Sequence, residues 1–417
     1  SHCPSLVNHH IMSGRQRRIR PSSYPDIGPW PDQPGSPSPG ASLGIAQPIS
    51  CAESACEGAA MATPTTQLVI HRPAQVTRRW LTAALRAAGA IDAAEVAMVS
   101  VAHWRGRTLS DLYRVEAAYA GPVPAETPHR FILKLSRSRQ ASTFAERGRW
   151  KEHEFYARVA ASMPDPPAPR SFAAAYDPRR RRSHLLLEDL SESHDAPSSP
   201  LPPRRDQLRG AVDALAHIHA WWWNHPDLQG VTDARDNAWV AEKSAAIERR
   251  LARFLAELGD YLPIAMRAAL ETSARAWPLI LRRTADLPLT VVHGDAHPWN
   301  LLYPRAADGR ARLLDWEGWS IEPGPHDLAS LLALHLPPSE RHAAHNQLIA
   351  HYAARLRALG VLDYDESACW ADYRLAVARR VLSPVALWSR GIKTRTWWPM
   401  LEHITAAYAE IRCDEIL

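Results

Sequence analysis

The sequence has no uninterrupted apolar run close to the roughly 18 residues that a membrane-spanning helix requires, so no membrane partner is expected. Cysteines are also few, five in 417 residues, and no two of them form a Cys-x-x-Cys pair. Because the number of cysteines is odd and their spacing is irregular, they exclude a disulfide framework and a structural zinc site. They favour a reducing compartment, for which we expect the cytoplasm. The pair Arg17 and Arg18 is followed by proline, serine and glycine, not by the apolar segment of an export signal.

Two further absences concern the class of enzyme and the class of partner. No Gly-x-x-x-x-Gly-Lys-Ser/Thr segment occurs, which excludes a P-loop kinase. The formal net charge is only +5, and the basic residues are not gathered into stripes with interleaved aromatic residues. Nucleic acid is therefore not an expected partner, whereas an anionic small molecule such as a nucleotide suits this charge. The pattern gives no indication of the oligomeric state.

What is present divides the chain into three parts. Residues 1–60 are rich in proline, serine, glycine and alanine without strand or helix periodicity, so we expect a disordered tail there, with Met61 as a candidate natural start. Residues 61–190 combine strand-like runs with helices and are predicted to form an N-terminal lobe. Residues 191–417 are mainly helical and are predicted to form a larger C-terminal lobe. The predicted fold class is α+β, with a small antiparallel sheet in the first lobe.

The individual elements follow from periodicity and from breaker residues. In the first lobe we expect a helix over 76–88, a strand hairpin over 109–120 and 129–135, a helix over 145–161, and strands over 172–176 and 184–187. In the second lobe we expect short strands at 290–293 and 312–314 between helices.

The most informative stretch is HGDAHPWN at residues 293–300, followed by LLDWE at residues 313–317. Phosphoryl transfer needs a carboxylate that orients the acceptor hydroxyl and oxygen ligands that hold Mg²⁺ on the phosphates. Asp295, in a loop after a buried strand, can accept the hydroxyl proton. Asn300 supplies an amide oxygen and Asp315 a carboxylate for the metal.

The same stretch allows another interpretation. His293, Asp295 and His297 occupy alternate positions, which also suits the Zn²⁺ or iron site of a metal-dependent hydrolase. A dinuclear phosphoesterase would need a later Gly-Asn-His block, and the sequence contains none. The pattern therefore favours phosphoryl transfer over metal-dependent hydrolysis.

Two charged residues in the first lobe support this interpretation independently. Alternation along the strand at 129–135 places Lys134 on the face opposite Phe131 and Leu133. Helical spacing places Glu152 on the same face as Tyr156, which predicts that Glu152 points inward. An inward lysine and an inward glutamate form the ion pair that aligns phosphates in kinase-like folds. The alternative is that Lys134 is a surface lysine on an edge strand.

HGDAHPWN followed by LLDWE resembles the HGDxHxxN signature and DxE-type metal motif of the aminoglycoside phosphotransferase and choline kinase group, which has a two-lobed, protein-kinase-like fold. By this resemblance Asp295 is the catalytic base, and Asn300 and Asp315 are Mg²⁺ ligands. Asp327, in a stretch similar to the family's Asp-Leu-Ala helix start, is implied as a structural residue. The resemblance covers about residues 75–417, and the tryptophan-rich C-terminal part is similar to bacterial relatives of the ecdysteroid-kinase-like branch.

The resemblance also implies a nucleotide site. The run LLLEDL at residues 185–190 is similar to the family's hinge, where backbone groups near Glu188 and Leu190 would hold the base of ATP or GTP. Ser110 and its neighbouring amides would cap the phosphates, although this turn has one glycine where protein kinases have a glycine-rich loop. Residues 61–190 are thus the expected nucleotide-binding lobe, and residues 191–417 the expected catalytic and acceptor-binding lobe.

Two hypotheses remain. The first is an ATP-dependent, Mg²⁺-requiring phosphotransferase acting on a hydroxyl of a small molecule, such as an antibiotic, a sterol-like alcohol, an amino alcohol or a sugar. The second is a kinase-like binding or regulatory module without catalysis, which would have no need of the complete set of phosphate, base and metal residues. A protein kinase is excluded, because only twelve positions separate Asp315 from Asp327 and leave no room for an activation segment.

Overall fold

The computed structural model describes residues 69–106, 110–137, 151–197, 202–228 and 236–417. The predicted tail over residues 1–60, the candidate start at Met61, Leu109 of the predicted hairpin and the first six residues of the predicted helix at 145–161 all lie outside the described residues.

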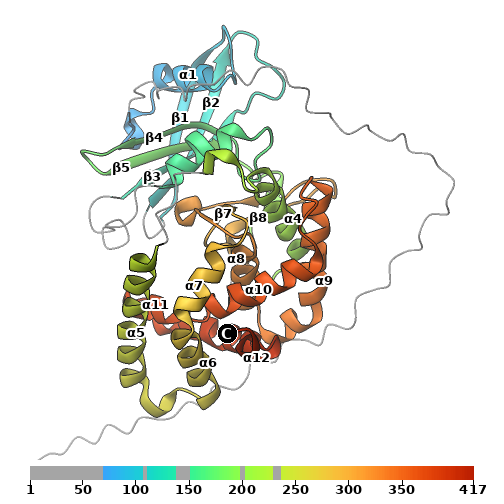
Figure 1. Cartoon of the computed structure of the whole chain (residues 1–417). Coiled ribbons are helices and arrows are strands. Elements are labelled where there is room, and N and C mark those ends of the chain that lie inside the picture. The colour runs from blue at the N-terminus through green and yellow to red at the C-terminus, as the bar shows by residue number, and fades with distance from the viewer. Residues whose placement is uncertain (1–68, 107–109, 138–150, 198–201, 229–235) are drawn as a thin grey trace, which may run out of the picture. The chain divides into compact units, whose positions relative to one another are not determined.

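The first part of the described chain is built on a five-stranded antiparallel sheet with the strand order β1-β2-β3-β5-β4 (Figure 1). Its strands are β1 (Glu95–Gly106), β2 (Ser110–Ala120), β3 (Arg130–Ser136), β4 (Ser171–Asp177) and β5 (Arg182–Glu188). The predicted hairpin is confirmed as β2 and β3, and the two later strands as β4 and β5. Because β3 lies between β2 and β5, Lys134 is on a central strand, and the edge-strand interpretation of this lysine is wrong.

Strand β1 is not predicted by the sequence pattern, because most of its residues are not buried and its pairing is irregular. Val96 is its one buried residue, and its pairing with β2 is irregular between Val96 and Met98 and again between His103 and Arg105. Each irregularity breaks the alternation of apolar and polar residues that marks a strand.

A buried core lies between one face of this sheet and helix α1 (Arg78–Ala87), the predicted helix at 76–88. The helix begins where the Thr77 hydroxyl accepts a hydrogen bond from the Trp80 amide. Leu81 and Leu85 then pack with Phe131 and Leu133 of β3. Alternation along β3 therefore leaves its other face, which carries Lys134, free for a different role.

The second predicted helix of this lobe is not uniform. Helix α3 (Lys151–Glu154) continues as a π-helical segment, Phe155–Val159, and ends in a 3₁₀ turn, Ala160–Ser162. Helical segments with π geometry are rare and often lie at functional sites. This one begins three residues after Glu152.

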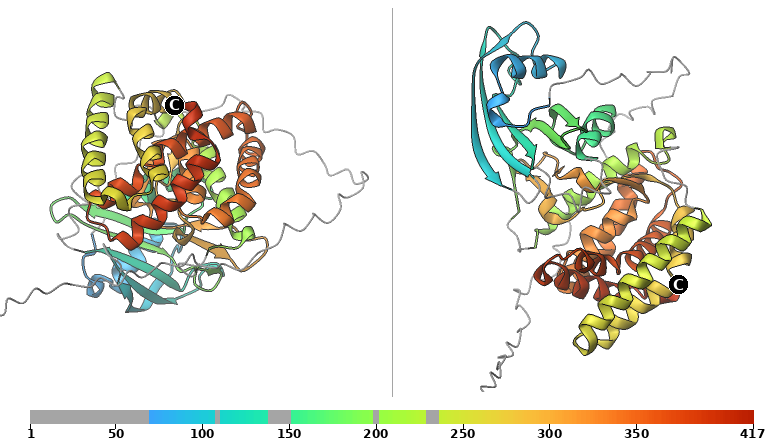
Figure 2. Two further views of the ribbon diagram at one scale, coloured as in Figure 1. Left: turned by 90° about the horizontal axis from the view of Figure 1, so that it is seen from below. Right: turned by 90° about the vertical axis from the view of Figure 1, so that its left-hand side faces the viewer.

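From Arg205 onward the chain is mainly helical (Figure 1). The helices are α4 (Arg205–Trp221), α5 (Asn237–Leu258), α6 (Ile264–Arg275), α7 (Trp277–Ala285), α8 (Pro325–Leu328), α9 (Pro338–Ala358), α10 (Glu366–Arg380), α11 (Ser383–Ser389) and α12 (Thr394–Glu410). Helices α5 and α6 follow one another along the chain and lie side by side (Figure 2). Among the helices that the structure describes, none is both long enough and apolar enough to cross a membrane.

Short strands lie between these helices: β6 (His194–Asp195), β7 (Thr290–Val292), β8 (Leu301–Pro304), β9 (Arg312–Leu313) and β10 (Ser320–Glu322). Strand β7 pairs with β10, and β8 pairs with both β6 and β9. The predicted strands at 290–293 and 312–314 are confirmed as β7 and β9. An antiparallel sheet followed by a mainly helical part also confirms the predicted α+β class.

Candidate active site

Lys134 lies at the centre of a group of carboxylates. Its Nζ is 2.7 Å from Glu152 Oε2, 2.5 Å from Asp315 Oδ1 and 3.7 Å from Glu317 Oε1. Glu152 is buried, as the helical spacing predicts. The predicted ion pair between Lys134 and Glu152 is therefore confirmed, and Asp315 of the metal motif meets the same ammonium.

Burial and charge act against each other in this group. Burial disfavours the charged form of Lys134, but the carboxylates of Glu152, Asp315 and Glu317 outweigh it and raise the pKa of Lys134 above its ordinary value. Burial likewise raises the pKa of Glu152 to about 7, although the ammonium of Lys134 opposes this shift. Three carboxylates facing one ammonium leave an excess of negative charge, which a divalent cation can neutralise.

The three carboxylates are also close enough to share a metal ion. Glu152, Asp315 and Glu317 each offer one oxygen, and these atoms lie within 4.8 Å of one another. Carboxylate oxygens are hard ligands of the kind that Mg²⁺ prefers. Glu317 belongs to the DWE motif in the sequence, but its closeness to Lys134 is apparent only from the structure.

The backbone of Asp315 adopts the left-handed conformation, with φ 64° and ψ 56°. Few residues other than glycine adopt it, and it persists where the surroundings hold it. Here the Leu314 amide donates to the Asn300 carbonyl at 2.8 Å, and the Trp316 ring stacks on Phe155 with 3.7 Å between ring centroids. The residues on both sides of Asp315 are thus held in place.

Asp295 lies in the loop between β7 and the 3₁₀ turn Pro298–Asn300. Its side chain is 60% exposed, and its Oδ2 lies 3.8 Å from Nε2 of His297. The Asn300 side-chain nitrogen donates to the Asp295 carbonyl at 3.1 Å, so the amide oxygen of Asn300 remains for another partner. One short loop therefore carries an accessible carboxylate and a neutral amide oxygen.

A buried network holds this loop. Asp327 is fully buried, and its carboxylate accepts hydrogen bonds from the amides of His293 at 2.6 Å and Gly294 at 2.9 Å. His219 Nε2 lies 3.3 Å from the same carboxylate, and its Nδ1 is 2.8 Å from the hydroxyl of Tyr352. Although burial opposes ionisation, the hydrogen bond with His219 and the nearby histidines hold the pKa of Asp327 at about 2. Asp327 is therefore an anion that caps the loop carrying Asp295.

Some parts of this network have no signal in the sequence. His219 appears there only as a packed helical residue, and nothing connects Arg380 with the loop. In the structure Arg380 is buried, and its Nη2 donates to the Gly294 carbonyl at 2.8 Å. The contact of His219 with Asp327 and that of Arg380 with Gly294 each join residues far apart in the chain, so only the fold reveals them.

Gly294 and Gly318 bring the Asp295 loop against the turn that follows Asp315. Gly294 has φ +79°, and a Cβ placed there would lie 2.1 Å from the Gly318 carbonyl oxygen. We expect Gly294→Ala to lower the free energy of unfolding by about 3 kcal/mol, because backbone must move to accept the methyl group. Chemical denaturation measures this change.

Gly89→Ala is the matched control for Gly294→Ala. Gly89 also has a positive φ, +62°, but a Cβ there would meet no atom within 4 Å. Its cost should be that of left-handed backbone alone, about 1 kcal/mol. If both variants lost the same stability, the close approach of Gly294 to Gly318 would not be needed.

The remaining predicted site residues lie around the sheet. Ser110, buried at the start of β2, lines a cavity of about 10 Å³ together with Lys134, Ser136 and Glu152, and its neighbours 107–109 lie outside the described residues. Glu188 ends β5, and its side chain accepts a hydrogen bond from the Arg170 amide. Thus Ser110 joins the Lys134 group, whereas Glu188 has a backbone partner of its own.

Leu190 follows β5 in the segment predicted to be the hinge. It is buried, and its carbonyl accepts hydrogen bonds from the amides of Ser193 at 3.1 Å and His194 at 2.9 Å. These bonds form a turn that leads into β6. A role of Leu190 or Glu188 toward a nucleobase stays a prediction.

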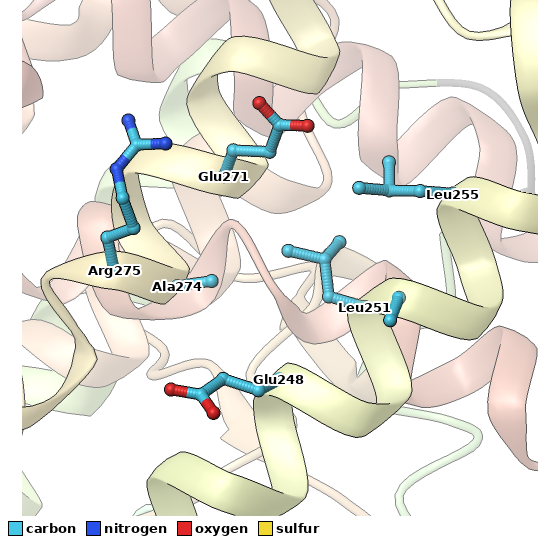
Figure 3. Close-up of a pocket in the computed structure, with 7 residues that line it drawn as sticks. Glu248, Leu251, Leu255, Glu271, Ala274 and Arg275 are labelled. Carbon is cyan, nitrogen blue, oxygen red and sulfur yellow. The ribbon is translucent and has the colours of Figure 1, made fainter.

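A separate hollow of about 320 Å³ lies on the paired helices α5 and α6 (Figure 3). Its apolar lining consists of Leu251, Ala252 and Leu255 of α5 and Ala274 of α6. Glu248, Glu271 and Arg275 are the charged residues around it. None of the predicted catalytic, metal or nucleotide residues lines this hollow.

The central part of the chain matches a known protein family. The family model described as the phosphotransferase enzyme family matches residues 125–370, which is more than half of the chain. No curated protein sequence matches the chain.

Solved structures similar to the chain include three kinases of small molecules. A macrolide 2′-phosphotransferase from Brachybacterium faecium is 14% identical over 79% of this chain and 97% of its own, with a TM-score of 0.42. A choline kinase from Streptococcus pneumoniae is 14% identical over 75% of this chain and 93% of its own, with a TM-score of 0.43. An ethanolamine kinase from Plasmodium vivax is 10% identical over 76% of this chain and 83% of its own, with a TM-score of 0.47.

Proposed function

Because the chain belongs to the phosphotransferase enzyme family, we propose that it transfers the γ-phosphate of ATP or GTP to a hydroxyl group of a small molecule, with Mg²⁺ as the metal. The observation that carries this proposal is the group around Lys134, which brings the ammonium of β3, Glu152 of α3 and Asp315 of the metal motif within hydrogen-bonding distance. A binding module without catalysis has no need of this group together with an accessible Asp295. We therefore favour the enzyme.

The oxygen donors fit a magnesium ion. Asp315 and Asn300 would hold it, since one offers a carboxylate and the other an amide oxygen whose nitrogen is already bonded within the loop. Glu317 lies beside Asp315 and adds a further carboxylate. When bound, Mg²⁺ would offset the charge of the phosphate oxygens.

Asp295 is proposed as the catalytic base. An exposed carboxylate can accept a hydrogen bond from the acceptor hydroxyl, orient its oxygen toward the phosphate and take its proton. The capping of His293 and Gly294 by Asp327 holds the backbone that carries it. His297, close to the Asp295 carboxylate, further limits where that carboxylate can turn.

Nucleotide binding is proposed for the sheet side of the site. Lys134, kept charged by its carboxylates, would contact phosphate oxygens, and Glu152 would hold it in place. Ser110 would cap the same phosphates, and backbone groups around Glu188 and Leu190 would contact the base. We accordingly propose residues 61–190 as the nucleotide-binding lobe and residues 191–417 as the catalytic and acceptor-binding lobe. The narrower likeness to the ecdysteroid-kinase-like branch stays a prediction.

A screen for ADP or GDP release tests the reaction. The purified protein would be incubated with ATP or GTP, Mg²⁺ and, one at a time, hydroxylated antibiotics, sterol-like alcohols, amino alcohols and sugars. We expect acceptor-dependent nucleotide consumption that chelation of Mg²⁺ abolishes. If no acceptor stimulates consumption while the nucleotide binds, the non-catalytic module becomes the better explanation.

Lys134→Ala should weaken binding of the Mg²⁺–nucleotide by roughly 30-fold or more, the effect of removing one partner of a buried charge pair. Glu152→Ala should have a milder effect, because Asp315 still contacts the ammonium. Calorimetric titration with a non-hydrolysable ATP analogue measures both. If the Lys134 variant bound the nucleotide as tightly as the parent, Lys134 would not be part of the nucleotide site.

A further inference from the structure

Asp165 lies outside every predicted site, in the loop that joins the helical segment after Glu152 to β4. Its two carboxylate oxygens are bound by two arginines from the C-terminal part of the chain. Arg310 Nη1 donates to Oδ2 at 2.5 Å, and Arg312 Nη1 donates to Oδ1 at 3.2 Å. One aspartate therefore holds both arginines, more than 140 residues away along the chain.

Backbone groups of the same loop reinforce this contact. The Leu313 amide of β9 donates to the Pro167 carbonyl at 2.7 Å, and Arg312 Nη1 also donates to the Pro166 carbonyl at 3.1 Å. From helix α4, His217 Nε2 lies 2.9 Å from the Asp165 carbonyl. The loop is thus attached to β9 and to α4 at once.

Strand β9 leads directly to the proposed metal ligand. Arg312 and Leu313 form the strand, and Asp315 follows two residues later. The intervening Leu314 is held by the loop of the proposed base: its amide donates to the Asn300 carbonyl, and its carbonyl lies 2.8 Å from His293 Nε2. A displacement of β9 would therefore move Asp315 relative to both the base loop and Lys134.

We propose that Asp165 is a positioning residue that couples the Glu152 helix to the Asp315 strand, so that Lys134, Glu152 and the proposed metal ligand keep one geometry whether or not a nucleotide is bound. This inference rests on the proposed function for its catalytic meaning. Its structural content, the coupling of two distant segments through Asp165, holds independently of the reaction.

The exposure of this ion pair distinguishes a positioning role from a general contribution to stability. The side chains of Asp165 and Arg310 are about half exposed, at 47% and 62%, and exposed ion pairs contribute little to folding. Asp165→Asn should therefore leave the protein folded. Its effect should be local, at the two segments that the aspartate joins.

Hydrogen exchange followed by mass spectrometry tests the coupling without any ligand. In Asp165→Asn we expect faster exchange in peptides covering both residues 151–162 and residues 312–318, because the bond from the Leu313 amide to Pro167 opens more often. Asp165→Glu, which keeps the charge, should restore most of the protection. Faster exchange in only one of the two segments would overturn the proposal.

The control variant is Asp213→Asn. Asp213 also pairs with a half-exposed arginine, Arg355, at 3.0 Å, but this contact joins α4 to α9 and not to the Asp315 strand. It should leave exchange in both test segments unchanged. An equal effect of Asp213→Asn would show that any lost surface ion pair loosens these segments.

Calorimetry then tests the consequence for the site. With a non-hydrolysable ATP analogue, the gain in affinity on adding Mg²⁺ should fall about three- to five-fold in Asp165→Asn, whereas affinity without Mg²⁺ should stay within about two-fold of the parent. An unchanged Mg²⁺ effect would overturn the positioning role. If the parent itself binds no nucleotide, the proposed function fails, and the exchange experiment alone decides the coupling.

Discussion

Asp295→Asn is expected to lower turnover by about 10³-fold, within the 10²- to 10⁴-fold range of general base catalysis. Asparagine keeps the shape of the side chain but cannot take the proton of the acceptor hydroxyl. Because the Asp295 side chain is 60% exposed and the loop is held through backbone contacts, the fold should not change. Initial rates with an acceptor from the nucleotide-release screen measure the effect.

Two measurements accompany this variant. Its melting temperature should match that of the parent, and it should bind the Mg²⁺–nucleotide with near-normal affinity, since neither depends on the proton acceptor. Substantial turnover by Asp295→Asn would mean that the catalytic-base assignment is wrong. The loop would then have to be interpreted as structural.

Asp315→Asn should also lower turnover strongly, but for a different reason. It removes a charged oxygen from the proposed metal site, and we expect the Mg²⁺-dependent gain in nucleotide affinity to fall by at least about ten-fold. The left-handed backbone at this position should persist, because asparagine is among the residues that tolerate it best. Calorimetric titration of a non-hydrolysable nucleotide with and without Mg²⁺ measures the loss.

The Asp295 variant is the matched control for this experiment, since both substitutions exchange a carboxylate for an amide. Asp295→Asn should keep the Mg²⁺ effect that Asp315→Asn loses. A normal Mg²⁺ effect in Asp315→Asn would mean that other residues hold the metal, such as Glu152 and Glu317, whose carboxylates lie close to that of Asp315.

Local patterns in the sequence were enough to predict much of the fold. The hairpin of β2 and β3, helix α1 and the short strands β7 and β9 each follow from periodicity within a few residues. The inward orientation of Lys134 and Glu152 follows from the same periodicity, because each side chain's direction is set by its own strand or helix. Strand β1 escaped prediction, since its irregular pairing and exposure leave no such pattern.

By itself, then, the sequence determined the α+β class, the family motif and the residue types that phosphoryl transfer needs. Only the tertiary structure decided which of them meet: the closeness of Glu317 to Lys134, the capping of the base loop by Asp327 with His219, and the attachment of β9 to Asp165. These contacts join residues dozens to more than 140 positions apart, and no local periodicity encodes them. They arise because the packing of whole helices and strands brings distant side chains together, and a buried charged group such as Asp327 then requires a partner.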